Sequence, residues 1–244
     1  MDQMPYVRSV QIKSADQLDW SIYPYNIPTV NDLEKIEFHP KITFFVGDNG
    51  SGKSTILEAL ALALGFSEEG GTRNVMLNSA SSASPLHESL RIIKSFKKPK
   101  DYYFLRAESF YNVGTYMNEL NYLVEYGGNI HERSHGEAFI KVLTSKLKGK
   151  GLYLMDEPEA ALSPSMQIMA LSALHQLCED DSQMIIATHS PILLAYPHCK
   201  IYQFTDTGIK SVSYEETDHF RITKDFLNCY QKRVQQLLED DVDQ

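Results

Sequence analysis

Short apolar runs alternate along the chain with longer segments in which apolar side chains recur every three or four positions. The short runs are rich in β-branched and aromatic residues and predict buried strands, and the longer spacing predicts amphipathic helices. Strands are predicted at 7–12, 36–38, 41–46, 102–105, 152–155, 184–187 and 201–204. Helices are predicted at 53–64, 86–96, 137–147, from 164 onward and at 226–238. Buried strands that alternate with helices are typical of an α/β fold with a mostly parallel central sheet.

Local sequence signals define where one helix begins and predict that two long segments are loops. Ser163 and Pro164 predict an N-cap and a first helical position, followed by an apolar stripe. The stripe consists of Met166, Met169, Leu174, Leu177 and Cys178. Residues 66–85 and 111–136 are polar or glycine-rich with little periodicity, which predicts loops, and the acidic tail 239–243 is expected to fray.

Composition limits the function classes. The 244 residues are 43% hydrophobic and 23% charged, as in ordinary globular proteins. The net charge of −9 argues against nucleic-acid binding through bulk charge but not through a local basic patch. The longest nearly apolar stretch, Ile56 to Phe66, contains Glu58 and is shorter than the roughly 20 residues of a membrane-spanning helix. No signal peptide is evident, and the three cysteines match no zinc or disulfide framework, so we expect a cytoplasmic protein.

The predicted strand at 41–46 is followed by a phosphate-binding loop and then a helix. Glycines let successive backbone N–H groups point at a phosphate, and the helix N-terminus adds a favourable dipole. Lys53 would reach the β- and γ-phosphates, and Ser54 would bind Mg²⁺ through its hydroxyl. The expected ATP-binding residues are Gly47, Asp48, Asn49, Gly50, Ser51, Gly52, Lys53, Ser54 and Thr55.

Two further strand ends carry candidate catalytic groups. Asp156 and Glu157 follow the strand at 152–155, at the edge where parallel sheets bind ligands. We expect Asp156 to help hold Mg²⁺ and Glu157 to polarise the attacking water. His189 follows the strand at 184–187 and is placed to bind a γ-phosphate or orient the water. The alternative for a single histidine is a structural role.

A third motif, Arg133-Ser134-His135-Gly136-Glu137, opens the helix predicted at 137–147. A serine and a glycine at a helix N-terminus offer a hydroxyl and N–H groups to an anion. A simple helix cap, with Glu137 in a position like that of a capping box, is the alternative.

Taken in order, these motifs resemble an ABC-type ATPase head, and in particular the stand-alone predicted ATPases allied to the RecF, SMC and OLD branch. The segments 106–110 and 220–228 are also similar to that group. The resemblance implies an ATP-sandwiched homodimer in which Ser134, Gly136 and Glu137 of one copy cap the nucleotide of the other. It implies that residues 160–163 form the D-loop and that His189 is the switch histidine. The Q-loop glutamine is absent, and Glu108 is the nearest candidate metal ligand at that place.

The resemblance also implies one ABC-type ATPase domain over residues 1–244. Its parts would be an N-terminal region of antiparallel β-strands (1–40), the phosphate loop and its helix (41–65), a helical signature lobe (66–150), the Walker B and switch half (151–238) and the acidic tail (239–244). Tyr23 and Tyr25 are candidates to stack on adenine, with packing in an N-terminal sheet as the alternative. The remaining histidines, His219 among them, show no metal-ligand spacing and are interpreted as surface or structural residues.

The task that ATP hydrolysis would drive stays open at this level. Two basic clusters, the first interleaved with aromatic residues, favour DNA contact in repair, maintenance or phage defence, and a solvated helix face is the alternative. The first cluster comprises Arg91, Lys94, Lys97, Lys98, Lys100 and Arg106 with Phe96, Tyr102 and Tyr103, and the second comprises Lys141, Lys146, Lys148 and Lys150, with Arg73 as a further candidate. An ATP-gated switch for a partner effector protein and an ATP-binding transporter subunit are the other hypotheses.

Overall fold

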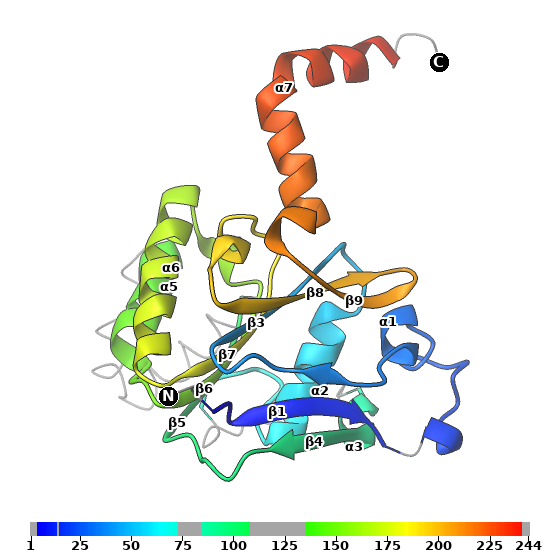
Figure 1. Cartoon of the computed structure of the whole chain (residues 1–244), viewed down its shortest axis with the longest axis vertical. Coiled ribbons are helices and arrows are strands. Elements are labelled where there is room, and N and C mark those ends of the chain that lie inside the picture. Colours follow the sequence, from blue (N-terminus) through cyan, green and yellow to red (C-terminus); the bar gives the residue numbers. More distant parts are fainter. Residues whose placement is uncertain (1–3, 14, 73–83, 108–134, 241–244) are drawn as a thin grey trace.

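The computed structural model describes residues 4–13, 15–72, 84–107 and 135–240 (Figure 1). Its strands are β1 Val7–Ile12, β2 Ile36–Glu37, β3 Ile42–Gly47, β4 Leu90–Lys94, β5 Asp101–Arg106, β6 Gly151–Asp156, β7 Gln183–Ala187, β8 Cys199–Thr205 and β9 Gly208–Val212. Its α-helices are α1 Pro28–Asn31, α2 Lys53–Leu64, α3 Leu86–Ser89, α5 His135–Lys141, α6 Pro164–Glu179 and α7 Asp218–Asp240. Short helical turns are η1 Ala15–Gln17, η4 Val142–Lys146, η5 Pro158–Ala161, η6 Leu193–Ala195 and η7 Tyr214–Glu216.

The strands form two sheets. The central sheet has the order β5-β6-β7-β3-β8-β9 and is parallel except for β9, which forms a hairpin with β8. The smaller sheet is antiparallel and has the order β2-β1-β4. The fold is therefore mixed α/β with a mostly parallel central sheet, and the predicted fold class and N-terminal antiparallel strands are confirmed.

Two hydrophobic clusters cover opposite faces of the central sheet. Alternation along β3 sends Phe44 into one cluster and Phe45 into the other. The first cluster packs the sheet against α5 and α6, and the second packs it against α2 and the smaller sheet (Figure 1). The buried amide of Gln183 joins the sheets, because it donates to Val7 O and accepts from Val7 N, both at 2.8 Å. Helix α2 is thus fixed between two sheets, with its N-terminus at the C-terminal edge of the central one.

Most predicted elements match the observed ones. Six of the seven predicted strands lie within β1, β3, β5, β6, β7 and β8 to within one or two residues at each end, the seventh is the short β2, and α2 spans the predicted residues. The side chain of Ser163 caps α6 by accepting a hydrogen bond from Met166 N, with Pro164 in the first turn, as predicted. The predicted helix at 137–147 is present as α5 and the π-helical turn η4.

Three predictions about elements are wrong. Residues 86–96 do not form one helix, because only α3 is helical and Leu90–Lys94 pairs antiparallel with β1 as β4. Met169 lies outside the apolar stripe of α6, since its side chain is 57% exposed and Ala170 and Ala173 face the core instead. The terminal helix begins at Asp218 rather than at 226, and its backbone is non-helical at Cys229.

The predicted loop at 66–85 is described only at its two ends, and the loop at 111–136 lies almost entirely outside the described residues. Within the described parts of the chain, no helix is both long enough and apolar enough to cross a bilayer.

Candidate nucleotide-binding site

The loop between β3 and α2 is held in a shape that requires glycine at Gly52. This residue has φ +93°, and a Cβ atom there would lie 2.5 Å from Oγ1 of Thr29. The Thr29 hydroxyl in turn donates a 2.5 Å hydrogen bond to Ser51 O, which ties the loop to α1. Contacts within the chain therefore hold the loop in shape, and its amides precede the N-terminus of α2.

Lys53 folds back over this loop. Its ammonium donates to Gly47 O at 2.8 Å and to Asp48 O at 2.9 Å, and the residue is only 4% exposed. Burial lowers the pKa of the Lys53 ammonium, and the nearby carboxylates of Glu157 and Asp156 partly oppose that shift. The Lys53 ammonium therefore lies against the loop, where its positive charge would attract a bound anion.

Ser54 and Asp156 join the phosphate loop to β6, which is separated from β3 in the sheet by β7. Ser54 Oγ donates a 2.9 Å hydrogen bond to Oδ1 of Asp156, which ends β6 and is 8% exposed. A hydroxyl and a carboxylate are hard oxygen ligands that suit Mg²⁺. Within the described ranges, no group of three or more His, Cys, Asp or Glu side chains could hold a metal by itself. This donor set fits Mg²⁺ bound through a few protein oxygens together with substrate phosphates.

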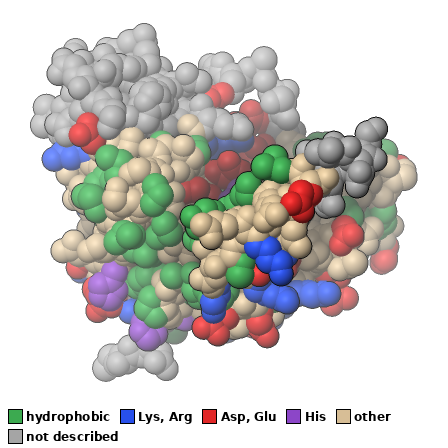
Figure 2. Space-filling view, turned by 90° about the horizontal axis from the view of Figure 1, so that it is seen from above, with side chains coloured by type: hydrophobic (Ala, Val, Ile, Leu, Met, Phe, Trp, Pro, Cys, Tyr) green, Lys and Arg blue, Asp and Glu red, His purple; other side chains and the backbone are tan. Residues whose placement is uncertain are grey.

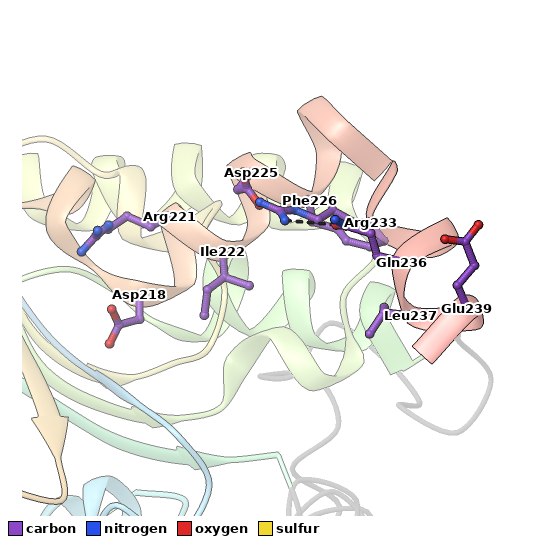
Figure 3. A pocket seen from close by; sticks show the side chains of 9 residues that line it. All are labelled: Asp218, Arg221, Ile222, Asp225, Phe226, Arg233, Gln236, Leu237 and Glu239. Carbon is purple, nitrogen blue, oxygen red and sulfur yellow. Dashed lines mark hydrogen bonds and ion pairs between the residues drawn. The ribbon is translucent and has the colours of Figure 1, made fainter. Parts of the chain in front are cut away.

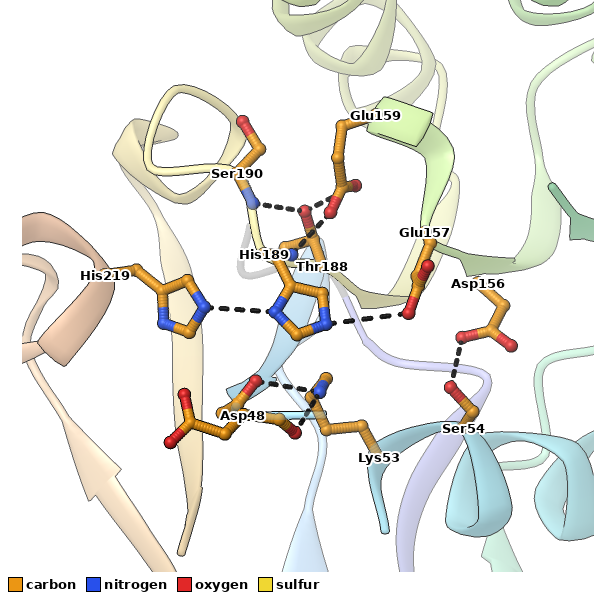
Figure 4. Close-up of polar contacts among 11 residues, drawn as sticks. Asp48, Lys53, Ser54, Asp156, Glu157, Glu159, Thr188, His189, Ser190 and His219 are labelled. Carbon is orange, nitrogen blue, oxygen red and sulfur yellow. Dashed lines mark hydrogen bonds and ion pairs between the residues drawn. The ribbon is translucent and has the colours of Figure 1, made fainter. Parts of the chain in front are cut away.

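Glu157 and His189 lie next to each other across the ends of β6 and β7 (Figure 4). The Glu157 backbone has φ +50°, and its N–H donates to Ala187 O at 2.9 Å. Its Oε1 lies 3.5 Å from Nε2 of His189, and both side chains are partly exposed. On the other side of the ring, Nδ1 of His189 lies 3.1 Å from Nε2 of His219, the second residue of α7.

Both imidazoles are held in surroundings that disfavour their charged forms. Burial lowers the pKa of His189, and the charges of Lys53 and His219 add to the effect. Burial likewise lowers the pKa of His219, with Asp48 opposing the shift. These surroundings favour the neutral form of each ring, and between two neutral imidazoles one nitrogen donates and the other accepts.

Glu159 fixes the turn that carries His189. Its Oε2 accepts a 2.7 Å hydrogen bond from Thr188 Oγ1, and its Oε1 accepts a 2.5 Å bond from His189 N. Burial raises the pKa of Glu159, and the two hydrogen bonds from the turn oppose that shift. This carboxylate clamps the turn after β7 to η5.

The proposed signature lies on another part of the molecule. Gly136 is buried, and a Cβ atom there would clash with the Met166 thioether and approach Ala161 O to 2.9 Å. Glu137 is exposed on the same turn of α5. Packing of α5 on η5 and α6 thus places these residues beside the D-loop candidate Ala160–Ser163 of the same chain. Ser134, Glu108 and Arg73 lie outside the described residues.

The two tyrosines considered for adenine stacking differ in exposure. Tyr25 is 7% exposed, packs edge-on against Trp20 and is hydrogen-bonded through its hydroxyl to Ser89 at 2.9 Å. It is a core residue, which contradicts the stacking hypothesis for Tyr25. Tyr23 is 64% exposed, so the hypothesis stays a prediction for that ring alone.

An open groove of about 1130 Å³ lies along α7, away from the phosphate loop (Figure 3). Its lining includes Arg221, Ile222, Phe226, Arg233 and Leu237. Arg233 crosses the kink at Cys229 to form an ion pair with Asp225 at 2.8 Å. Figure 2 looks down on this end of the molecule and shows hydrophobic side chains exposed beside both basic and acidic ones. Only the first turn of α7, at His219, takes part in the site.

Sequence reasoning misses Thr29, Glu159 and His219. Thr29 is distant in the sequence and carries no motif. Glu159 does carry a signal, because a second glutamate two residues after Glu157 at a ligand-binding sheet edge is an unusual concentration of charge. The sequence pattern indicates only a surface or structural role for His219, whose partner in the fold is His189.

Several known proteins share part of this sequence or arrangement. The SMC head domain from Thermotoga maritima is 13% identical with a TM-score of 0.48, over 86% of this chain and 99% of that one. CbiO1 of Clostridium perfringens, described as part of the ABC transporter complex cbiONQ, is 19% identical with a TM-score of 0.48, over 97% of this chain and all of the other. A putative metal-chelate type ABC transporter in an inward-facing conformation is 17% identical with a TM-score of 0.45, over 75% and 76% of the two chains.

A short segment also matches the DNA replication and repair protein RecF of Colwellia psychrerythraea, strain 34H. The match is 53% identical over 36 residues, which is 15% of this chain and only 9% of the length of that relative. The family model AAA_23, described as an AAA domain, matches residues 24–190 and so spans the phosphate loop, Asp156 and His189. The chain therefore belongs to the AAA_23 family of AAA domains.

Proposed function

We propose that this chain is a Mg²⁺-dependent ATPase that converts ATP and water to ADP and phosphate. The observation that carries the proposal is the 2.9 Å contact between Ser54 and Asp156. It joins the phosphate loop to the acidic edge of the sheet, with Lys53 on one side and Glu157 and His189 on the other. Family membership supports nucleotide binding by this loop.

Each group has a part in the proposed reaction. The amides of residues 47–55 and the Lys53 ammonium neutralise phosphate charge. Ser54 and Asp156 would hold Mg²⁺, with Glu108 as a further candidate ligand, and the bound ion would supply additional positive charge. Glu157 orients the attacking water, and its partly exposed carboxylate leaves room for one. His189 donates a hydrogen bond to the terminal phosphate.

We further propose that two copies sandwich ATP. Glu157 and His189 are both partly exposed in the single chain, so the reacting end of the nucleotide would face solvent. Water exclusion strengthens every electrostatic contact with a phosphate, and a second copy would supply it. Ser134, Gly136 and Glu137 of that copy are the proposed cap. The chain would thus be a single cytoplasmic ATPase domain that works as a homodimer.

The test is a Glu157→Gln variant analysed by light scattering with and without Mg²⁺-ATP. Glutamine keeps the shape but cannot polarise water as a carboxylate does, so ATP should bind, persist and hold two copies together. The matched control is Glu179→Gln, which alters an exposed carboxylate paired with Lys41 on the surface. A Glu157→Gln chain that stays monomeric in ATP while binding it would refute the sandwich dimer.

DNA is the second partner that an observation favours. The two predicted basic clusters meet in the fold, because Lys100 N donates to Lys150 O at 2.8 Å. Lys98, Lys100 and Lys150 are exposed there, and Phe96 is 87% exposed nearby. These residues precede β5 and β6, so the surface lies at the opposite end of the strands from Asp156.

The basic surface is smaller than the sequence predicts. Arg106 is paired with Glu58 at 3.1 Å and Tyr103 is buried, so neither is presented to a DNA backbone. Lys97 is partly exposed and is paired with Asp181 at 3.1 Å. A triple variant with Lys98, Lys100 and Lys150 changed to Glu should abolish salt-dependent DNA binding, and Lys210→Glu on β9 should not. Absence of binding by the unaltered chain at low salt would reject the DNA hypothesis.

A further inference from the structure

The contact between His189 and His219 joins two segments 30 residues apart in sequence. The rings are 5.2 Å apart between centroids and tilted by 48°, and they meet through their nitrogen atoms rather than face to face. His189 stands between two groups, with His219 at Nδ1 and Glu157 at Nε2 (Figure 4). Nδ1 is thus hydrogen-bonded to His219, whereas Nε2 faces the Glu157 carboxylate and has no hydrogen-bond partner among the described residues.

The chemistry on the two sides decides which nitrogen of His189 carries the proton. A neutral imidazole has one N–H donor and one bare nitrogen that accepts. The Glu157 carboxylate, 3.5 Å from Nε2, can only accept, which favours a proton on Nε2. Nδ1 is then an acceptor, and the group that faces it must donate. Nε2 of His219 is at 3.1 Å and carries a hydrogen in one of its own two tautomers.

The first turn of α7 is fixed firmly enough for this role. Asp218 accepts a 2.5 Å hydrogen bond from Nε2 of Gln203 on β8 and donates its own N–H back to Gln203 at 3.2 Å. The Phe220 ring packs on Tyr214 at 4.6 Å between centroids. His219 lies between these two anchored residues, so its backbone is fixed at the point where its ring meets His189.

We propose that His219 is a positioning residue that donates a hydrogen bond to Nδ1 of His189 and so keeps the Nε2 proton of His189 directed at the reacting phosphate. The role rests on the proposed function, in which His189 contacts that phosphate. His219 itself acts only through His189. The first turn of α7 is thereby part of the ATPase site, although the rest of that helix projects away from it (Figure 1).

The tautomer can be measured without any nucleotide. Long-range ¹H–¹⁵N correlation spectra of the ¹⁵N-labelled full chain at neutral pH distinguish a protonated from a bare imidazole nitrogen. We expect His189 to be protonated at Nε2 and bare at Nδ1 in the unaltered chain, and to sample both tautomers in His219→Leu. A His189 ring protonated at Nδ1 in the unaltered chain would overturn the proposal, because His219 would then be the acceptor.

Kinetics test the catalytic consequence. His219→Leu should lower kcat for ATP about 10- to 100-fold, by analogy with removal of the outer hydrogen-bond partner of a metal-bound histidine. KM for ATP should stay within about threefold, because binding is carried by the phosphate loop. His219→Gln places an amide donor near the same point and should retain most of kcat.

Two comparisons separate positioning from mere support of α7. Phe220→Leu loosens the same turn but keeps the donor, so its kcat should stay close to that of the unaltered chain. The proposal would be overturned if Phe220→Leu lowered kcat as much as His219→Leu does. It would also be overturned if kcat of His219→Gln were as low as that of His219→Leu. An unaltered chain without ATPase activity would refute the proposed function instead, and the tautomer spectra would still decide the donor.

Discussion

The Thr188 hydroxyl donates a 2.7 Å hydrogen bond to Oε2 of Glu159 and so joins the turn after β7 to the turn after β6. Thr188 is fully buried, and its Oγ1 also accepts from Ser190 N at 3.0 Å. The next residue, His189, donates its N–H to the same carboxylate. The relative position of His189 and Glu157 therefore depends on a clamp that touches neither side chain.

Replacing Thr188 with Val keeps the shape of the side chain and removes the hydroxyl. A carboxylate oxygen of Glu159 and the Ser190 N–H then lose a partner, which should lower the free energy of unfolding by about 1–3 kcal/mol. Urea titration followed by circular dichroism measures the change. Thr207→Val, at an exposed turn of the β8–β9 hairpin, is the matched control and should change stability by less than about 0.5 kcal/mol. Equal values for the two variants would mean that the clamp contributes nothing.

The same carboxyl group makes stability depend on pH. Burial raises the pKa of Glu159 above its ordinary 4.5, so the native state binds this proton more readily than the unfolded chain. The contribution of Glu159 to stability is then full below about pH 4.5 and is lost as the pH rises through the native pKa. Glu159→Gln cannot titrate, so the unfolding free energy of the unaltered chain should fall relative to this variant as the pH rises from about 4.5 to about 7. A relative rise over that interval would contradict the assignment.

Gly52 and Gly50 provide a matched pair for the shape of the phosphate loop. Both have positive φ, but a Cβ at Gly52 would meet Thr29 at 2.5 Å, whereas a Cβ at Gly50 would have nothing within 4 Å. Gly50→Ala should therefore cost only the backbone strain of about 1 kcal/mol, and Gly52→Ala should in addition displace Thr29 and the loop. We expect isothermal titration calorimetry to show that Gly52→Ala raises the Kd for ATP at least tenfold more than Gly50→Ala does. Equal losses would show that Thr29 does not shape the loop.

The sequence predicts the parts of the site that local patterns determine. A strand, a glycine-rich turn and a helix are specified within 24 residues at 41–64, so the roles of Lys53 and Ser54 follow from local pattern alone. Asp156 and Glu157 follow from the rule that parallel sheets bind ligands at their C-terminal edge. Their proximity to Ser54 then requires only that β6 and β3 share a sheet, with β7 between them.

The errors arise where a distant partner decides the outcome. Leu90–Lys94 has helical spacing, yet pairing with β1 provides backbone hydrogen bonds that make it a strand. Met169 fits an apolar stripe, but the rotation of α6 on the sheet turns it to solvent. The sequence does not predict the role of His219, because that role depends on the first turn of α7 lying next to the turn after β7. Periodicity contains no information on such contacts.

Lys53 gives the most direct test of the candidate site. Its ammonium bonds to Gly47 O and Asp48 O, and a bound triphosphate would replace these neutral acceptors with charged ones. Lys53→Ala should therefore abolish stabilisation by Mg²⁺-ATP, whereas the unaltered chain should gain about 2.7 kcal/mol at a ligand concentration of about 100 times Kd. Differential scanning fluorimetry over a range of ATP concentrations measures the difference. The matched control is Lys41→Ala, which removes a surface lysine paired with Glu179 and should respond to ATP like the unaltered chain. A Lys53→Ala chain stabilised by ATP to the same extent would show that the nucleotide binds elsewhere.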